Sequence, residues 1–179
     1  SSSYPLPTWT TLIFDRVSFT YVPKRKNIPF TLKDVTFQIK SGECIGIIGP
    51  SGSGKSTLLD LMLGLYTPYS GTISLYSNML GQPLQNDLSK PWQQNIAYVP
   101  QEVYLADTTI LQNVTLGFSD NTINIPNVLH SLAQAQILTF VESLPDGIHT
   151  NLGNDGIRLS GGQRQRIGIA RALYRRASL

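Results

Sequence analysis

The chain has 179 residues, 41% of them apolar, which suffices for one domain with a hydrophobic core, and 14% charged, against roughly 25% in an average soluble domain. Its net charge of +3 and the lack of any block of five like charges exclude a basic arm and argue against nucleic acid as a partner. The single cysteine excludes an internal disulfide and fits a cytosolic setting, and no apolar run approaches the roughly 18 residues of a membrane span.

The N-terminal part of the chain favours β-structure. Residues 1–10 are rich in Ser and Pro and lack the charged head and apolar run of a signal peptide, so they indicate the end of a linker. Residues 12–21 and 30–39 alternate apolar and polar side chains, which predicts two half-exposed antiparallel strands. Residues 44–48 are apolar without alternation, which predicts a strand buried on both faces, with Cys44 as a small buried residue.

Three shorter elements are expected next. Residues 55–65, after a glycine-rich loop, predict a helix, and residues 71–76 predict a further strand. Residues 95–99 predict a short strand that stops at Pro100.

The second half of the chain has a helical character. Residues 101–155 are rich in Asn, Gln, Thr, Ser and Leu and show helical periodicity around 126–140, which indicates a mostly helical subdomain inserted into an α/β core. Residues 160–176 predict one helix, with Ser160 as its N-cap.

The loop at 49–56 fits the pattern G-x-x-x-x-G-K-[ST], between the predicted buried strand and the predicted helix. Its glycines let successive N–H groups converge on a phosphate, and the helix adds its positive N-terminal end. Lys55 can reach the β- and γ-phosphates, Ser56 can ligate Mg²⁺, and Thr57 can support the α-phosphate. The predicted phosphate-binding residues are Gly49, Pro50, Ser51, Gly52, Ser53, Gly54, Lys55, Ser56 and Thr57. By itself this loop does not separate a transporter ATPase from a GTPase or a small-molecule kinase.

A second cluster of backbone amides stands at the start of the last predicted helix. Leu159 is followed there by Ser160, Gly161, Gly162 and Gln163, so that a serine cap and two glycines form another anion-binding helix end. One nucleotide does not need two such cradles on the same chain. We therefore predict that two chains face each other head to tail, and that each phosphate loop meets the serine-glycine cluster of the partner.

With these two motifs, and with the continuation at 164–173, the chain resembles the ATP-binding cassette (ABC) family over nearly its whole length. The resemblance implies an α/β fold: a P-loop NTPase (ABC ATPase) core with an N-terminal antiparallel β subdomain and an inserted helical subdomain, incomplete at the C-terminus. It implies a linker from a membrane domain at 1–10, the ATP-binding α/β core with its β subdomain at 11–100, the helical subdomain at 101–159, and the signature helix at 160–179, leading to a Walker B strand outside the chain.

The resemblance also gives roles to single residues. Tyr21 matches the aromatic residue that stacks on adenine, and Gln101 matches the glutamine loop that senses Mg²⁺ and the γ-phosphate and links to the membrane domain. The alternatives are a plain strand tyrosine and a turn glutamine. The implied metal ligands are Ser56 and Gln101.

Three segments are similar to the exporter branch, in which the ATPase follows a membrane domain on the same polypeptide. Residues 108–114 and 144–147 resemble exporter motifs, and 150–156 resembles the exporters' contact segment before the signature. Asn154 stands there where the family usually has glutamate, which puts this residue's part in coupling between chains in doubt.

The catalytic groups of the family are not found in the chain. They are an Asp-Glu pair on the strand after the signature helix and a later histidine, whereas here no acidic residue follows Asp155 and both histidines precede the signature. We expect no catalytic residue in this chain and ATP hydrolysis near zero. We also expect self-association or strand exchange, because the strands that would cover the core are missing.

The leading hypothesis is the ATP-binding domain of an ABC exporter that binds ATP and Mg²⁺, dimerises and drives a transmembrane domain at the cytoplasmic face of the plasma (inner) membrane. Lipid, peptide and drug all remain open as substrates, with a slight preference for a lipid-type flippase. The alternative is a non-hydrolysing nucleotide-binding module. An ABC protein that acts on DNA is disfavoured, because no heptads and no cysteine lie between the two motifs.

Overall fold

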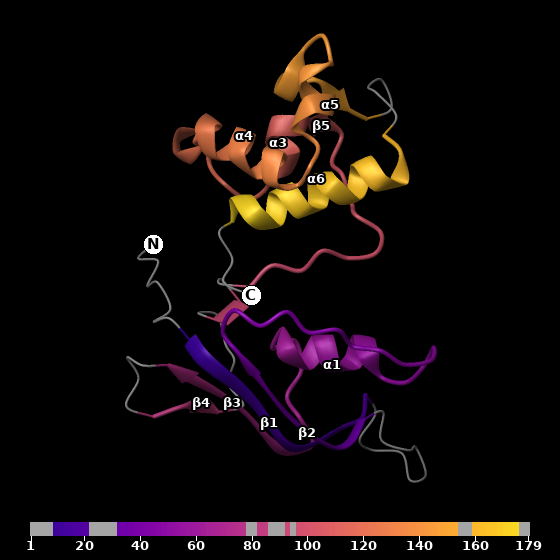
Figure 1. Ribbon diagram of the computed structural model, residues 1–179, viewed down its shortest axis with the longest axis vertical. Coiled ribbons are helices and arrows are strands. Elements are labelled where there is room, and N and C mark those ends of the chain that lie inside the picture. Colours follow the sequence, from indigo (N-terminus) through magenta and orange to yellow (C-terminus); the bar gives the residue numbers. More distant parts are fainter. Residues whose placement is uncertain are drawn as a thin grey trace. The chain divides into compact units, whose positions relative to one another are not determined.

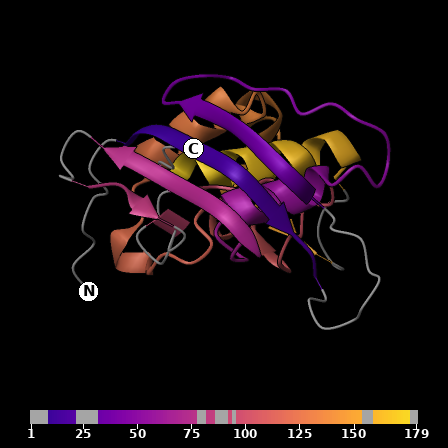
Figure 2. The ribbon, with the colours of Figure 1, turned by 90° about the horizontal axis from the view of Figure 1, so that it is seen from below.

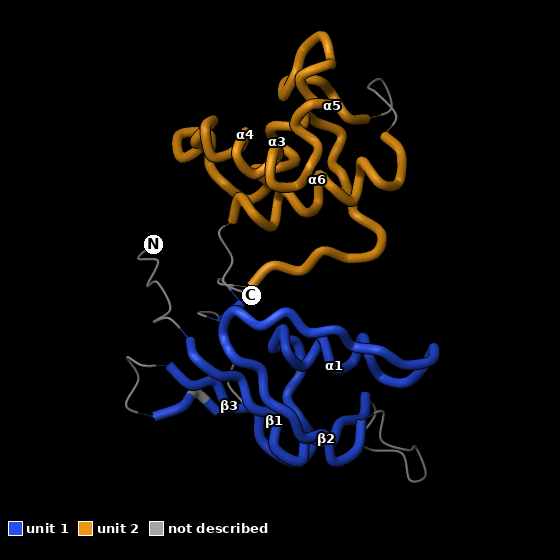
Figure 3. The backbone as a smooth tube through the Cα atoms, in the orientation of Figure 1, with its two compact units in different colours: residues 1–95 blue, residues 96–179 orange. Residues whose placement is uncertain are grey.

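Strands and helices separate along the chain into two parts. The computed structural model describes the following residues: 9–21, 32–77, 82–85, 92–93, 96–153 and 159–175. The chain divides into two compact units, residues 1–95 and 96–179 (Figure 3). Unit 1 combines a β-sheet with helix α1 (Lys55–Met62), and unit 2 is mostly helical (Figure 1). Residues 1–8 of the linker predicted at 1–10, Asn154 and position 176 of the last predicted helix lie outside the described residues, whereas residues 9 and 10 of the predicted linker belong to the first strand.

Unit 1 is built on an antiparallel sheet, which confirms the two predicted antiparallel strands. Its strands are β1 (Trp9–Phe19), β2 (Leu32–Lys40), β3 (Ser70–Ser77) and β4 (Leu84–Gln85). They pair in the order β2-β1-β3-β4 (Figure 2). Phe14 and Val17 of β1 are fully buried because this strand has a neighbour on each side, whereas β2 at the edge keeps most of its positions partly or fully exposed.

Helix α1 follows the glycine-rich loop, as predicted, and its C-terminal end completes the core of unit 1. Leu61 is fully buried, and the indole Nε1 of Trp92 donates a hydrogen bond of 2.7 Å to the carbonyl of Met62. Trp92 is buried as well and packs edge-on against Trp9, with 6.0 Å between the ring centroids. Contacts of this kind fix the helix against the sheet although it is only 8 residues long.

The strands predicted at 44–48 and 95–99 do not form in the described part of the structure. Residues 43–50 have no regular secondary structure, and none of the described strands pairs with them. Cys44 is exposed rather than buried, and the side chain of Ile48 is 97% exposed. Residues 96–99 lie in no strand either, while position 95 is outside the described residues. A strand needs hydrogen bonds to a neighbouring strand, so an apolar run alone does not form one.

Unit 2 packs short helices against one side of a longer helix. Its elements are β5 (Thr108–Thr109), α3 (Ile110–Val114), η1 (Asp120–Thr122), α4 (Ile125–Gln134), α5 (Leu138–Glu142), η2 (Gly147–His149), β6 (Asn151–Leu152) and α6 (Gly161–Tyr174). Helix α6 contacts both α3 and α4. The helical periodicity predicted around 126–140 is confirmed by α4 and α5, and the helix predicted from Ser160 onward is confirmed by α6. None of the helices in the described part of the chain combines the length and apolarity that crossing a membrane requires.

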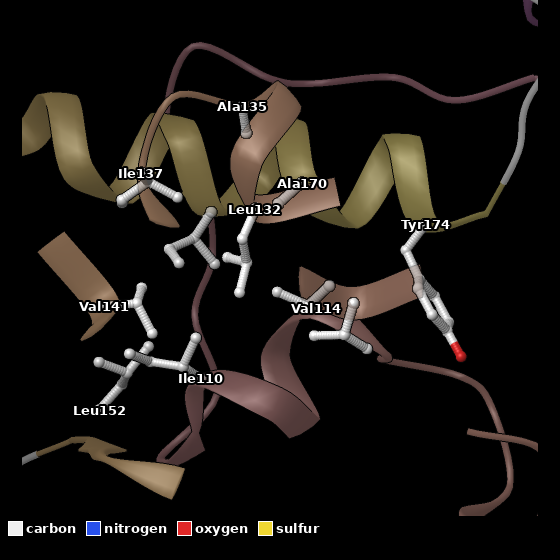
Figure 4. Packing of buried hydrophobic residues seen from close by; sticks show 11 residues of the cluster. Ile110, Val114, Leu132, Ala135, Ile137, Val141, Leu152, Ala170 and Tyr174 are labelled. Atoms are coloured by element: carbon white, nitrogen blue, oxygen red, sulfur yellow. The ribbon is translucent and has the colours of Figure 1, made fainter. Parts of the chain in front are cut away.

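A single apolar cluster holds unit 2 together (Figure 4). Its buried members come from the helices and from β6: Ile110, Val114, Val128, Leu132, Ala135, Ile137, Val141, Leu152, Ile167, Ala170 and Tyr174. The phenol of Tyr174 also accepts a hydrogen bond of 3.1 Å from the backbone N–H of Asn124, just before α4. Helix α6, which begins at the signature motif, is therefore anchored through its C-terminal half, residues 167–174, in the same core as the helices that precede it, while its first turns stay largely exposed.

Candidate nucleotide-binding site

The glycine-rich loop leads directly into the N-terminus of α1. Gly54 is the N-cap of the helix with φ 90°, and Gly52 has φ 77°, a backbone region that residues with a Cβ rarely adopt. No side chain in the described part of the chain caps α1. The loop is thus wound so that the first N–H groups of the helix are available to an anion.

Lys55 adds a positive charge to this helix end. Its Nζ donates hydrogen bonds of 2.8 Å to the carbonyls of both Gly49 and Pro50, so the ammonium group is held by the loop itself. The N–H of Ser53 donates a hydrogen bond of 3.3 Å to the carbonyl of Pro50. The Ser53 hydroxyl lies so close to Gly49 that a Cβ added there would stand only 2.7 Å from Oγ. These contacts hold the loop carbonyls and the Lys55 ammonium group close together beside the helix N-terminus, and their chemistry suits the predicted phosphate ligand.

Tyr21 reaches the same helix from the end of β1. Its hydroxyl lies 2.9 Å from Oγ1 of the buried Thr57 and donates to Oδ2 of Asp60 at 3.2 Å. The ring makes edge contacts with Phe19 and Tyr66, at centroid distances of 5.0 and 5.4 Å, and stays 48% exposed. The structure therefore brings Tyr21 to the residues that follow the phosphate loop and leaves about half of the residue open to a ligand.

Asp60 is a residue that sequence analysis missed. It follows Thr57 by three positions, so both side chains project from the same face of α1, and this spacing was the available signal. Its carboxylate accepts the Tyr21 hydroxyl and thereby orients the ring.

The signature motif forms the start of α6, as predicted. The Ser160 hydroxyl accepts from the N–H of Gln163 at 3.2 Å, and Oε1 of Gln163 accepts from the N–H of Ser160 at 2.8 Å, which makes a capping box. Gly161 and Gly162 are exposed. Because the capping box engages the amides of Ser160 and Gln163, the first-turn donors best placed for an anion are those of the two glycines.

Gln101 lies near this helix start within unit 2. A surface cavity of about 350 Å³ is lined by Gln101, Glu102, Val103, Gly161, Arg164 and Gln165. The two segments predicted to contact nucleotide in unit 2 thus border one cavity, and Tyr21 meets the phosphate-loop residues in unit 1.

The predicted metal ligands have suitable chemistry. The Ser56 hydroxyl and the Gln101 amide supply hard oxygen donors of the kind that Mg²⁺ accepts beside phosphate oxygens and water. Ser56 is exposed at the start of α1, and Gln101 is exposed beside the cavity. The described residues contain no group of three His, Cys, Asp or Glu side chains that could hold a metal by themselves.

Comparison with known proteins assigns the family. A family model described as ABC transporter matches residues 32–179, so the chain belongs to the ABC transporter family. The predicted fold class, an ABC ATPase domain of the P-loop NTPase type, is confirmed by this match and by the structural relative below. The relatives are exporters, which also confirms the predicted branch of the family.

Three relatives illustrate the similarity. The chain is 40% identical over 94% of its length to an ATP-dependent lipid A-core flippase of Ralstonia nicotianae and 41% identical over 93% to the ABC multidrug transporter mdr4 of Aspergillus fumigatus. It superposes on a solved bacterial Atm1-family ABC exporter with ATP bound, with a TM-score of 0.78 and 30% identity over 96% of the chain. The chain spans only 27%, 12% and 28% of these three proteins, respectively.

Proposed function

We propose that this chain binds ATP with Mg²⁺ and that, within a larger ABC exporter at the cytoplasmic face of a membrane, it couples ATP hydrolysis to transport. The observation that carries this proposal is the position of Lys55. Its ammonium group is held by two loop carbonyls beside a helix N-terminus that no described side chain caps. The fixed cation and the helix end attract the same ligand, a polyphosphate.

In this proposal the nucleotide lies along unit 1. The phosphates bind at 49–57, with Ser56 on Mg²⁺, and the adenine stacks on the exposed part of Tyr21. The contact between Tyr21 and Thr57 supports this assignment, because it places an aromatic ring beside the residue expected to support the α-phosphate. Gln101 completes the set as the second predicted metal ligand.

We further propose a head-to-tail dimer, in which the glycine amides at the start of α6 contact the nucleotide of a second ATP-binding domain. The exposure of Gly161 and Gly162 supports this role, since first-turn N–H groups have no acceptor within their own helix and these two lie open to a ligand. The domain divisions expected from the family and a contact to a transmembrane domain belong to the same proposal, with the linker limited to 1–8 because Trp9 and Thr10 lie in β1.

We propose that residues 1–179 alone do not turn over ATP. Within α1 the acidic side chain is Asp60, and its carboxylate is engaged by Tyr21 rather than directed to a metal. The exposed run at 44–48 supports the expectation that partner strands, with the Asp-Glu pair, come from elsewhere in the protein. A non-hydrolysing binding module remains the alternative for the full-length polypeptide.

Calorimetric titration with MgATP tests the binding step. We expect Lys55→Ala to weaken binding about 10- to 100-fold, which corresponds to the loss of charge-assisted hydrogen bonds to phosphate. Lys40→Ala, on the edge strand β2, is the matched control and leaves affinity unchanged. Equal affinity of wild type and Lys55→Ala would refute the assignment of the phosphate site.

Phosphate release tests the catalytic step. Residues 1–179 should release phosphate no faster than their Lys55→Ala variant. The full-length polypeptide should release phosphate faster than its own Lys55→Ala variant. If the full-length polypeptide binds MgATP without turnover, the non-hydrolysing alternative is the correct one.

The names of the relatives bear on the transported substrate. One relative is called a lipid A-core flippase and another a multidrug transporter. We propose an amphipathic, lipid-type substrate, which stimulation of ATPase activity by lipid added to detergent-solubilised full-length polypeptide would test.

A further inference from the structure

The segment that follows Gln101 runs along helix α6. Gln101 borders the same cavity as Gly161, in the first turn of that helix. Two residues later Val103 packs against the middle of α6, where a Cβ added to Gly168 would stand 2.7 Å from Cγ2 of Val103. Helix and segment are thus in van der Waals contact, and a side chain at position 168 would push them apart.

Arg171, one turn further along α6, ties the next part of this segment down. Its Nη2 donates to the carbonyl of Tyr104 at 3.1 Å, and its Nε donates to the carbonyl of Asn113 at 2.8 Å. Nη2 also donates to Oδ1 of Asn113 at 3.3 Å. One guanidinium therefore joins α6 to the segment after Gln101 and to the end of α3.

Asn113 completes the connection from the other side. Its side chain is fully buried, and its amide binds the segment at Ala106 and Thr109. Oδ1 accepts from the N–H of Ala106 at 2.9 Å, while Nδ2 donates to the carbonyls of Ala106 and Thr109, each at 3.0 Å. Every polar atom of the buried side chain is satisfied by segment 104–109 or by Arg171.

This arrangement exceeds what packing of the core requires. The core of unit 2 is supplied by apolar side chains such as Ile110 and Val114, which flank Asn113 on α3. A buried amide and a half-buried guanidinium cost free energy unless they are fully hydrogen-bonded. Burial lowers the pKa of Arg171 from its usual value, which shows that desolvation acts on its charged form. The benefit of the pair is a defined geometry for the backbone at 104–109.

We propose that Asn113 and Arg171 are positioning residues, which clasp segment 104–109 to α6 and so hold Gln101 at a fixed distance from the signature residues at 160–163. The inference rests on the proposed function, in which Gln101 contacts Mg²⁺ and the γ-phosphate and the signature residues contact the partner's nucleotide. With the clasp intact, a displacement of Gln101 carries the start of α6 with it. Neither clasp residue touches nucleotide.

The kinetic test uses the full-length polypeptide. Arg171→Lys keeps the charge but cannot make the three hydrogen bonds of the guanidinium. We expect kcat to fall about tenfold while KM for ATP stays within about twofold, since the phosphate loop belongs to unit 1 and does not depend on the clasp. Asn113→Ala should have the same effect, and the double variant should lose no more than the worse single variant. Arg175→Lys, at the exposed C-cap of α6, is the matched control.

Hydrogen exchange supplies a readout that does not depend on turnover. In Arg171→Lys the backbone amides at 103–106, including that of Ala106, should exchange at least tenfold faster, while those of β1 and α1 stay unchanged. If Asn113→Ala fails to fold, Val103→Ala loosens the same segment without touching the buried amide, and it should show a smaller effect of the same sign.

The outcomes separate the clasp from the proposed function. If the wild type does not bind MgATP, the proposed function is wrong. If amide hydrogen exchange at 103–106 is unchanged in Arg171→Lys, the proposed clasp is wrong. Faster exchange with an unchanged kcat would overturn the positioning role as well, because the segment would then be mobile without consequence. Faster exchange together with a selective loss of kcat supports the proposal.

Discussion

The hydroxyl of Tyr21 lies 2.9 Å from that of Thr57, although the two residues are 36 positions apart in the sequence. This hydrogen bond joins the end of β1 to the first turn of α1. It connects the residue predicted to stack on adenine with a residue predicted to support the phosphates. A nucleotide bound here would contact two elements that are already fixed to each other.

Two substitutions of Tyr21 should distinguish the contribution of its ring to ATP binding from the contribution of its hydroxyl to stability. Tyr21→Ala should weaken ATP binding about 5- to 150-fold, because stacking of a base on an aromatic ring contributes about 1–3 kcal/mol. Tyr21→Phe keeps the ring and should lose at most about threefold, with a decrease in the free energy of unfolding of about 1 kcal/mol from the lost hydrogen bonds. Calorimetric titration and urea unfolding measure the two effects. Equal affinities of the Ala and Phe variants would contradict the stacking role.

The capping box of α6 should have a function that the capping box of α3 lacks. Thr109 and Gln112 form the same reciprocal pair at the start of α3. Ser160→Ala and Thr109→Ala should each lower the free energy of unfolding by about 1 kcal/mol. Only Ser160→Ala should also impair MgATP-dependent dimerisation, followed by analytical ultracentrifugation of the full-length polypeptide. Equal impairment by the two variants would argue that stability alone is responsible.

Gly153 should tolerate alanine. A Cβ at this position would overlap the carboxylate of Asp107, but that carboxylate is the end of an exposed side chain and can turn toward solvent. We therefore expect Gly153→Ala to lower the free energy of unfolding of unit 2 by no more than about 0.5 kcal/mol, as measured by denaturant unfolding. A loss of more than about 1 kcal/mol that Asp107→Gly restores in the double variant would show instead that the Asp107 side chain is held in place.

The exposed run at 44–48 should control association of residues 1–179. Ile48 has almost no contact with the rest of the described protein. Ile48→Lys should therefore leave the free energy of unfolding within about 0.5 kcal/mol of wild type and reduce self-association measured by light scattering. Gln38→Lys, at an exposed position of the edge strand β2, serves as a surface control. A monodisperse monomer of the unmodified residues 1–179 would refute the predicted self-association.

Elements with strong local signals could be predicted from the sequence. The alternating residues of β1 and β2, the helix after Gly54 and the helix capped by Ser160 are all set by short-range patterns. The phosphate-loop and signature residues were identified in the same way, because their chemistry depends on consecutive residues. Their ligand contacts stay predictions.

Features that depend on distant partners could not be predicted. The strand predicted at 44–48 does not form. An apolar run of this kind is typical of a strand buried inside a sheet, and none of the described strands pairs with these residues. A buried strand before the phosphate loop was one of the features expected at this site. The family match over 32–179 shows membership of the ABC transporter family without that strand, and the site residues stay predictions. The pairing of Asn113 with Arg171 could not be predicted from the sequence, because the hydrogen bonds between them join residues 58 positions apart.

Cys44 offers a direct way to follow how the region before the phosphate loop changes in the assembled protein. It is the single cysteine in these 179 residues, and its side chain is exposed. A thiol there can take a maleimide dye without denaturant, so residues 1–179 carry a natural labelling position next to the nucleotide site. If another part of the protein covers this stretch, labelling should slow, and the rate of dye attachment then measures how exposed residues 44–48 are.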